Sequence, residues 1–167
     1  MKTKLLFAAF VFILCSGMSK TVSPAVLSII NITEFYDALQ SEDTVKINSF
    51  LKVLADDTAL SSIACKGALL MRKSGFQKSA KRKLEMFKQG RILLEDAIKK
   101  ENDNAEFRFL RLIIQENCPA FLKYHDKIKE DADAVKHFYK NFSAELKHAV
   151  ADYSKVSKSL KPDSFAD

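Results

Sequence analysis

Two arginines, Arg108 and Arg111, lie on the most apolar of the expected helices, among phenylalanine, leucine and isoleucine residues. A spacing of three places both guanidinium groups on one face of a helix. Surrounded by apolar side chains, each guanidinium needs acidic or amide partners. We interpret the pair either as an inter-helix ion pair that fixes packing register, which we favour, or as a site for an anion or a peptide carboxylate. The sequence offers Glu95, Asp96, Glu106 and Gln115 as internal partners.

A basic tract between residues 72 and 91 holds eight cations and one acid, Glu85, so its local net charge is 8 − 1 = +7. Such a tract is either a solvated face or a contact surface for an acidic partner, such as anionic lipid headgroups, an acidic polymer or a protein. Phe76 could add an apolar anchor, and Lys81, Arg82 and Lys83 are the candidate contacts. The tract comprises Arg72, Lys73, Lys78, Lys81, Arg82, Lys83, Lys88 and Arg91.

Signatures of catalysis and metal binding are missing from the sequence: it has no His-Glu-x-x-His, no Gly-rich phosphate loop and no Gly-x-Ser-x-Gly. His125, His137 and His148 are 12 and 11 residues apart, which is not the spacing of a zinc motif. Residues 102–104 and 131–133 resemble parts of a calcium loop but lack its glycine and closing glutamate. Helix capping and a solvated face explain these two segments. We therefore predict no enzyme activity, no cofactor and no metal.

The N-terminus has the pattern of a secretory signal peptide. Lys2 and Lys4 precede an apolar run at residues 5–14, and small residues follow to Gly17. Ten apolar residues are too few to span a bilayer, which takes about 20. We predict removal of residues 1–17 and a periplasmic or extracellular location. A lipoprotein acylated at Cys15 is the alternative, although Leu14 stands where a small residue is required.

The part of the chain after residue 17 has 150 residues, enough for one helical domain at 18–161 and a polar tail at 162–167. Without Lys2 and Lys4 its charge is 25 − 21 = +4, which does not indicate nucleic-acid binding. No later apolar run is long enough to cross a membrane. Asn31 and Asn141 begin N-glycosylation sequons, which matter only in a eukaryotic host.

Two cysteines remain after the signal, Cys65 and Cys118. In an oxidising compartment they could form a disulfide, whose closure of 52 intervening residues would stabilise the fold by about 4 kcal/mol. They could equally be two separate small apolar side chains in the core. Neither lies within four residues of a histidine, so the spacing indicates no local Cys–His site.

The apolar periodicity predicts an all-α protein of six or seven helices in antiparallel pairs, a helical bundle. Four glycines and three prolines leave little turn chemistry for strands. Gly67 falls inside a helix, so we expect a neighbouring helix to pack closely there. The expected helices cover residues 24–40, 44 to about 54, a cap at Thr58 to 74, about 80–100, a segment from the turn at 102–104 to Cys118, 126–140 and 143–160.

Gly90, Leu94, Ala97 and Asn102 follow the 4, 3, 5 spacing of the second half of a tetratricopeptide repeat, with Asn where proline is usual. This segment resembles that family over about one-tenth of the chain, and no second copy follows at the 34-residue period. The resemblance implies a TPR-like helical hairpin. The wider stretch through Phe107-Arg-Phe-Leu-Arg111 and Pro119-Ala-Phe-Leu resembles a group of small exported bacterial helical proteins of unassigned function, which implies export and a helical fold.

These features favour an exported, non-catalytic binding or scaffold protein of the cell envelope that acts through helical hairpins. Its expected partner is a protein or an anionic surface. The alternative is a carrier that holds a hydrophobic ligand between its helices, since the chain has thirteen phenylalanines to line a cavity.

Overall fold

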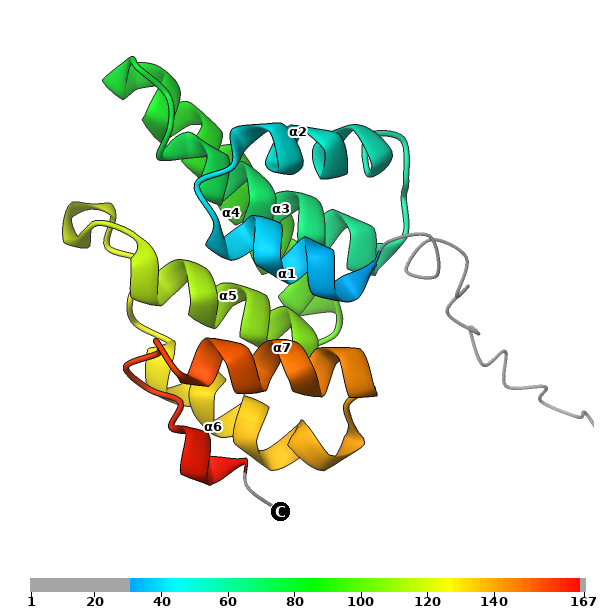
Figure 1. The fold of residues 1–167 in the computed structure, drawn as a ribbon. Helices are drawn as coiled ribbons and strands as arrows, with labels where there is room; N and C mark the ends of the chain where they lie inside the picture. The colour runs from blue at the N-terminus through cyan, green and yellow to red at the C-terminus, as the bar shows by residue number, and fades with distance from the viewer. Residues whose placement is uncertain (1–30, 166–167) are drawn as a thin grey trace, which may run out of the picture.

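The computed structural model describes residues 31–165, and in this range the chain folds into seven α-helices with no strand (Figure 1). This confirms the predicted all-α class. The signal peptide, Cys15 and the start of the predicted first helix lie outside the described residues. The helices are α1 (Ile32–Gln40), α2 (Thr44–Val53), α3 (Leu60–Ser74), α4 (Ala80–Lys100), α5 (Ala105–Asn117), α6 (Ile128–Phe138) and α7 (Ala144–Ser154), with 3-10 turns η1 (Ala120–Leu122), η2 (Tyr139–Asn141) and η3 (Pro162–Ser164).

Short polar side chains begin several of these helices. The carboxylate of Asp43 accepts hydrogen bonds from the first backbone N–H groups of α2, at 2.9 and 3.1 Å. Asn104 does the same for α5, as the predicted turn at 102–104 requires, and Ser143 caps α7. Each side chain satisfies donors that lack a partner inside the helix. Among the described helices, none is long and apolar enough to cross a membrane.

The helices α3 and α4 form an antiparallel hairpin with an unusually close crossing at two glycines. A Cβ atom added to Gly67 would lie 2.7 Å from the Gly90 carbonyl oxygen and 2.8 Å from the Leu94 amide nitrogen. Both of these contacts are with backbone atoms, which cannot swing aside. The expected close packing at Gly67 is therefore confirmed. This crossing sets the orientation of α3 and α4 relative to each other.

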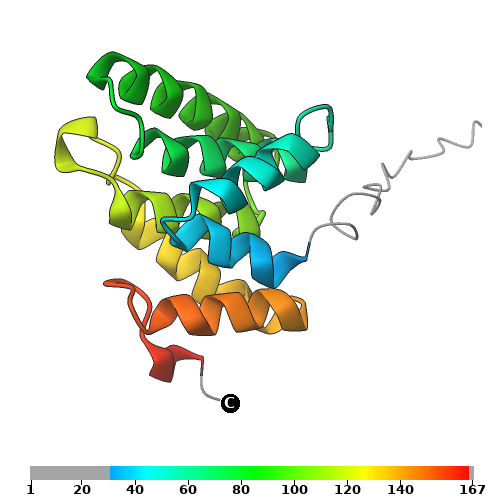
Figure 2. The same ribbon diagram turned by 45° about the horizontal axis from the view of Figure 1, so that its top comes forward.

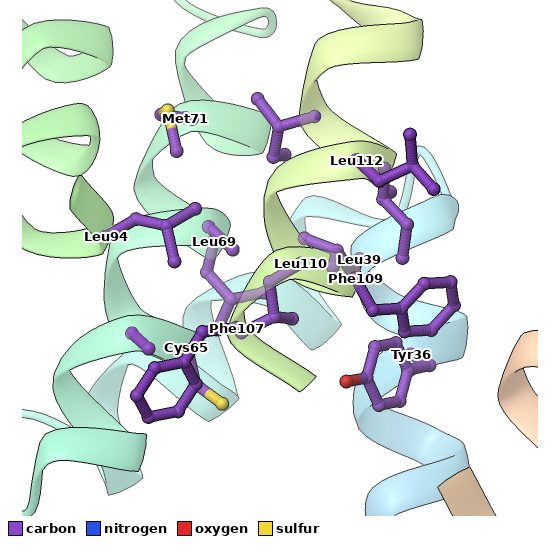
Figure 3. Packing of buried hydrophobic residues seen from close by; sticks show 14 of the residues in the cluster. Tyr36, Leu39, Cys65, Leu69, Met71, Leu94, Phe107, Phe109, Leu110 and Leu112 are labelled. Atoms are coloured by element: carbon purple, nitrogen blue, oxygen red, sulfur yellow. The ribbon is translucent and has the colours of Figure 1, made fainter. Parts of the chain in front are cut away.

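The centre of the core is α5, whose side chains meet those of α1, α3 and α4 (Figure 3). Phe107, Leu110 and Leu112 are each at most 2 % exposed. The Phe109 ring lies between two tyrosines, with its centroid 5.2 Å from that of Tyr36 and 5.7 Å from that of Tyr153. Nearly every residue of α5 is buried, apolar side chains on most of its surface and Arg108, Arg111 and Gln115 on the side that faces α6. The helix is enclosed because α6 packs on that side and Tyr153 of α7 contacts Phe109.

Within the described residues, α1 begins at Ile32, where the extended backbone of Asn31 and its side-chain bond to the Glu34 amide form the cap. The predicted start at residue 24 lies outside the described residues. The predicted end of the last helix was wrong, because this helix ends at Ser154 rather than at residue 160. The segment after Ser154 turns away because the Glu116 carboxylate accepts the backbone N–H groups of Lys158 and Ser159, at 3.1 and 2.8 Å.

The C-terminal residues that we predicted to form a polar tail contain one more core contact. The ring of Phe165 lies 4.6 Å from that of Tyr139, measured between centroids, and follows directly after η3. Residues 162–165 therefore fold back on the bundle.

Candidate functional site

The basic tract runs along the α3–α4 hairpin, whose free end projects beyond the other helices (Figures 1 and 2). Residues 74–85, the hairpin tip, comprise the last residue of α3, a short connection and the first six residues of α4. Residues 78–85 are all exposed. The charges of this segment therefore face solvent.

Three cations of the tract have a partner within the chain, and the other five form no ion pair within residues 31–165. Arg72 is structural: its Nε and Nη2 donate to the Ser41 carbonyl oxygen, at 3.1 and 2.8 Å, behind the C-terminus of α1. Arg91 stacks on the Tyr124 ring with its Cζ 4.7 Å from the centroid, and Lys81 reaches Glu85 only at 3.9 Å. The other cations form no ion pair with any described residue: Lys73, Lys78, Arg82, Lys83 and Lys88.

The start of α4 increases this positive charge. Ser79 makes no side-chain hydrogen bond as a cap, and the first turn contains no acidic residue. The N-terminus of a helix already carries partial positive charge, so an acidic group would be favourable there. Lys81, Arg82 and Lys83 occupy that turn instead. The hairpin tip is thus electrostatically unfavourable by itself, and a bound anionic group would relieve it.

A cavity of about 310 Å³ lies beneath the hairpin, between α3, α5 and the loop that contains η1. Ser74, Gly75 and Phe87 line it from the hairpin side, while Pro119 and Leu122 line it from the loop. Its floor comes from the core, including Leu39 and Ile113 of α1 and α5. The size lies at the lower end of the range for small-molecule sites.

Cys118 lies in the wall of this cavity and makes a tertiary contact with His125 that the spacing did not indicate. The Cys118 Sγ is 3.6 Å from His125 Nε2, and the same nitrogen is 3.1 Å from the Cys118 carbonyl oxygen. Because a carbonyl oxygen only accepts, Nε2 carries a proton and does not serve as a base for the thiol. Burial raises the pKa of the Cys118 thiol, which disfavours the reactive thiolate. The contact ties the loop to α5.

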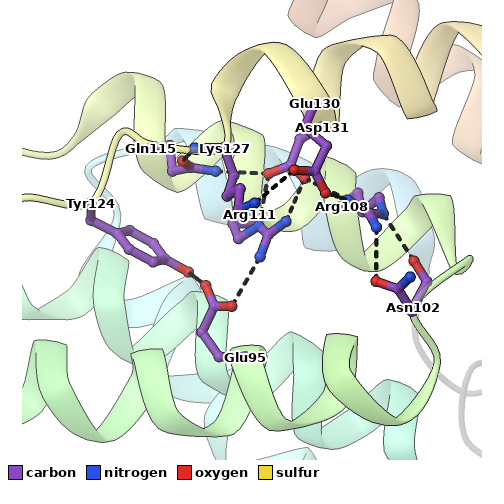
Figure 4. A network of polar contacts seen from close by, with 9 residues as sticks. All are labelled: Glu95, Asn102, Arg108, Arg111, Gln115, Tyr124, Lys127, Glu130 and Asp131. Carbon is purple, nitrogen blue, oxygen red and sulfur yellow. Dashed lines mark hydrogen bonds and ion pairs between the residues drawn. The ribbon is translucent and has the colours of Figure 1, made fainter.

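Arg108 and Arg111 lie on the opposite side of α5 from the cavity floor, in an internal polar network with α6 (Figure 4). Arg111 donates from Nε and Nη2 to the two Asp131 carboxylate oxygens, both at 2.7 Å, and from Nη1 to Glu95 at 2.9 Å. Arg108 donates to Glu130 at 2.8 Å and to the Asn102 side chain at 2.9 Å. The geometry is that of an inter-helix ion pair, and Glu95 is the partner that we correctly anticipated.

Asp131 is the residue of this network that the sequence analysis placed wrongly. We expected residues 131–133 on a solvated face, but Asp131 is 0 % exposed and also accepts a hydrogen bond from Gln115 at 2.7 Å. The packing of α6 on α5 turns Asp131 inward, while Asp133 stays exposed and pairs with Lys129. Glu95 extends the network to the loop by accepting from the Tyr124 hydroxyl at 2.7 Å.

The structure does not join Cys65 and Cys118, which are both free thiols. Cys65 lies in α3 close to Glu106, at the start of α5, whereas Cys118 follows the end of that 13-residue helix. A helix of this length spans about 20 Å, and a disulfide requires Cα atoms within about 7 Å. Among residues 31–165, no three His, Cys, Asp or Glu side chains are grouped to hold a metal ion. Asn31 and Asn141 are both exposed.

A scan against protein-family models and searches of curated proteins and of solved structures found no match to the chain.

Three features of this region were not anticipated from the sequence: the position of the cavity, which only Phe87 among the phenylalanines lines, the burial of Asp131 and the exposure of Phe121 in η1. Asp131 could have been suspected, because a buried arginine pair requires carboxylates and α6 is the next helix. The cavity depends on how three separate segments meet, and residue spacing carries no such information.

Proposed function

We propose that this chain is an exported, non-catalytic binding protein that acts at the cell envelope and engages an acidic partner through the tip of the α3–α4 hairpin. Export rests on the N-terminal pattern of Lys2, Lys4 and the apolar residues 5–14. The absence of catalytic motifs from the sequence, together with a cysteine whose neighbouring histidine nitrogen is a donor, supports a binding role.

One observation carries this proposal: five cations of the basic tract form no ion pair with a described residue, and they lie on a hairpin whose free end projects from the bundle. Arg108 and Arg111, the other candidate anion contacts, have their donors occupied by internal groups. A surface that only keeps the protein hydrated would work equally well if its cations were paired with acidic residues. Concentrated single-sign charge at a protruding end steers an oppositely charged partner.

The test is binding of a soluble acidic polymer, poly-aspartate, to the protein purified after export. We expect binding at about 0.05 M salt and release at about 1 M, where the Debye length is about 3 Å. Replacing Lys81, Arg82 and Lys83 by Gln should weaken binding about tenfold or more, because three exposed charges are lost at the site.

The matched control replaces Lys140, Lys158 and Lys161 by Gln, which removes the same charge from exposed positions outside the hairpin. This control should bind nearly as the parent does, and both variants should keep the parent melting midpoint. Equal weakening by the two variants would mean that the tract acts only through net charge and would contradict a site at the tip.

A second candidate function, carriage of a small hydrophobic ligand, is favoured by the cavity of about 310 Å³, whose lining is more apolar than polar. Native mass spectrometry of the protein purified from its own host would reveal such a ligand as an added mass that organic solvent removes. A co-purifying polypeptide instead would support the scaffold function.

A further inference from the structure

We infer that the acidic partner of the hairpin is an anionic lipid bilayer, and that Phe121 of the neighbouring η1 loop is the side chain that enters it. The inference rests on the proposed function, because it requires the basic tract to bind anions. It adds a second, apolar contact to the charged one. An experiment can disprove the apolar contact while the charged contact remains supported.

The loop at residues 118–124, here called the η1 loop, holds Phe121 outward. The Phe121 side chain is 79 % exposed, more than any other large apolar residue described. Its turn is closed by hydrogen bonds from Leu122 N to the Pro119 carbonyl and from Lys123 N to the Ala120 carbonyl, both 3.0 Å. Lys123 adopts a left-handed conformation with φ of 48°, which is uncommon for a residue other than glycine. These contacts define the turn, and in it the Phe121 side chain faces solvent.

The η1 loop is fastened to the helix that bears the cations. Tyr124 is 4 % exposed, and its ring contacts Phe87 edge-on at 5.7 Å between centroids and lies beneath the guanidinium of Arg91. Both partners belong to α4. The loop and the hairpin also share the walls of one cavity. In Figures 1 and 2 both segments project on the same side of the molecule, so a single surface can meet them together.

The chemistry of this side matches a bilayer better than a soluble polyanion. A lone exposed phenylalanine needs no explanation, but here it stands on a hydrogen-bonded turn beside exposed Lys123 and the unpaired cations of the hairpin. Leu84 adds an apolar side chain, 44 % exposed, among those cations. A soluble polyanion gives these apolar groups nothing to contact. An anionic bilayer offers negative headgroups to lysine and arginine and an interfacial apolar layer to Phe121.

The test compares Phe121→Ala with the parent on two probes: phosphatidylcholine vesicles containing phosphatidylglycerol, and poly-aspartate. We expect vesicle affinity to fall about tenfold or more, the cost of leaving a phenylalanine in water, and poly-aspartate affinity to stay unchanged. Val45→Ala, which truncates a 76 % exposed side chain on α2, is the control and should change neither.

A second measurement uses Phe121→Trp as a reporter, because the chain contains no tryptophan. Its fluorescence should shift to the blue with anionic vesicles and stay constant with poly-aspartate. If the vesicles bind without a shift, or Phe121→Ala binds them as the parent does, the bilayer inference is wrong and the charge-based function stands. If the parent binds neither probe, both are wrong.

Discussion

Asp131 is the carboxylate on which the two buried arginines converge, and it is fully enclosed. Burying an ion pair gives little net stability, but removing one partner leaves an uncompensated charge in the interior. Asp131→Ala should therefore lower the free energy of unfolding by about 3–5 kcal/mol, measured by urea denaturation. Asp133→Ala, two residues further along the same helix but exposed, is the matched control and should change little.

An unchanged denaturation midpoint in Asp131→Ala would mean that Glu95 and Glu130 compensate both guanidinium groups without Asp131. The η1 loop, which Tyr124 joins to Glu95, would then be held independently of α6. This outcome would contradict the role given to the network in joining α5 with α6.

Glu116 holds the chain beyond α7 with one carboxylate, which accepts from the hydroxyls of Tyr153 and Ser157 at 2.7 Å each and from the backbone amides of Lys158 and Ser159. Burial raises the pKa of Glu116, but the hydrogen bonds from Ser159, Ser157 and Tyr153 outweigh it and hold the pKa below its ordinary value of 4.5. A depressed carboxylate pKa stabilises the fold above 4.5, and that contribution is lost as the pH falls through the folded-state pKa.

Glu116→Gln should thus cost about 1–3 kcal/mol at pH 7, since an amide cannot accept from all of these donors. It should also flatten the loss of stability that the parent shows as the pH falls below 4.5. Urea denaturation across this pH range measures both effects. Glu42→Gln, at an exposed position without a side-chain hydrogen bond among the described contacts, should leave the pH profile as in the parent. If the stability of Glu116→Gln fell with pH as steeply as that of the parent, Glu116 would not be the carboxylate responsible for this pH dependence.

At the scale of the elements, the hairpin depends on its glycine crossing. Replacing a mid-helix glycine by alanine normally stabilises a helix by about 1 kcal/mol. Gly67→Ala should do the opposite here and lower stability by about 1–3 kcal/mol, because its Cβ meets backbone atoms of α4. The larger Gly67→Leu should cost at least as much. Thermal melting gives the sign directly.

Gly75→Ala is the control for this prediction. An added Cβ there meets only the Arg72 carbonyl oxygen, at 3.3 Å, and the backbone is right-handed, so alanine should be neutral or slightly stabilising. If Gly67→Ala raised the melting midpoint, α3 and α4 would have to move apart at little cost. The glycine crossing would then not determine the orientation of the hairpin.

The contrast between α4 and α7 shows which parts of the fold the sequence could predict. The bounds of α4 were predicted correctly at residues 80–100, because its apolar stripe and the turn at 102–104 are local signals. The end of α7 was predicted wrongly because Glu116, about forty residues earlier, removes the backbone donors that would continue the helix. Likewise the basic tract was visible in the sequence, whereas its projection from the bundle and the neighbouring Phe121 depend on tertiary packing.

At the scale of the whole molecule, export is the first expectation to test. The mature N-terminus should lie near residue 18, leaving 150 residues. Intact mass and N-terminal sequencing of the protein recovered from the envelope fraction would check this. Retention of residues 1–17 would contradict the export proposal, and a lipid on Cys15 would mean that the hairpin works close to a membrane by covalent tethering.

The packing of α7 against α1 has a consequence for how the domain comes apart (Figure 1). In an open helical array each unit touches only its neighbours, so unfolding can start at either end and spread. Here the last helix covers the first, and neither can peel away without uncovering the other. We expect the chain to melt in one all-or-none step, with equal calorimetric and van't Hoff enthalpies. A mechanical pull on the hairpin would then be resisted by all the described helices together rather than by the hairpin alone.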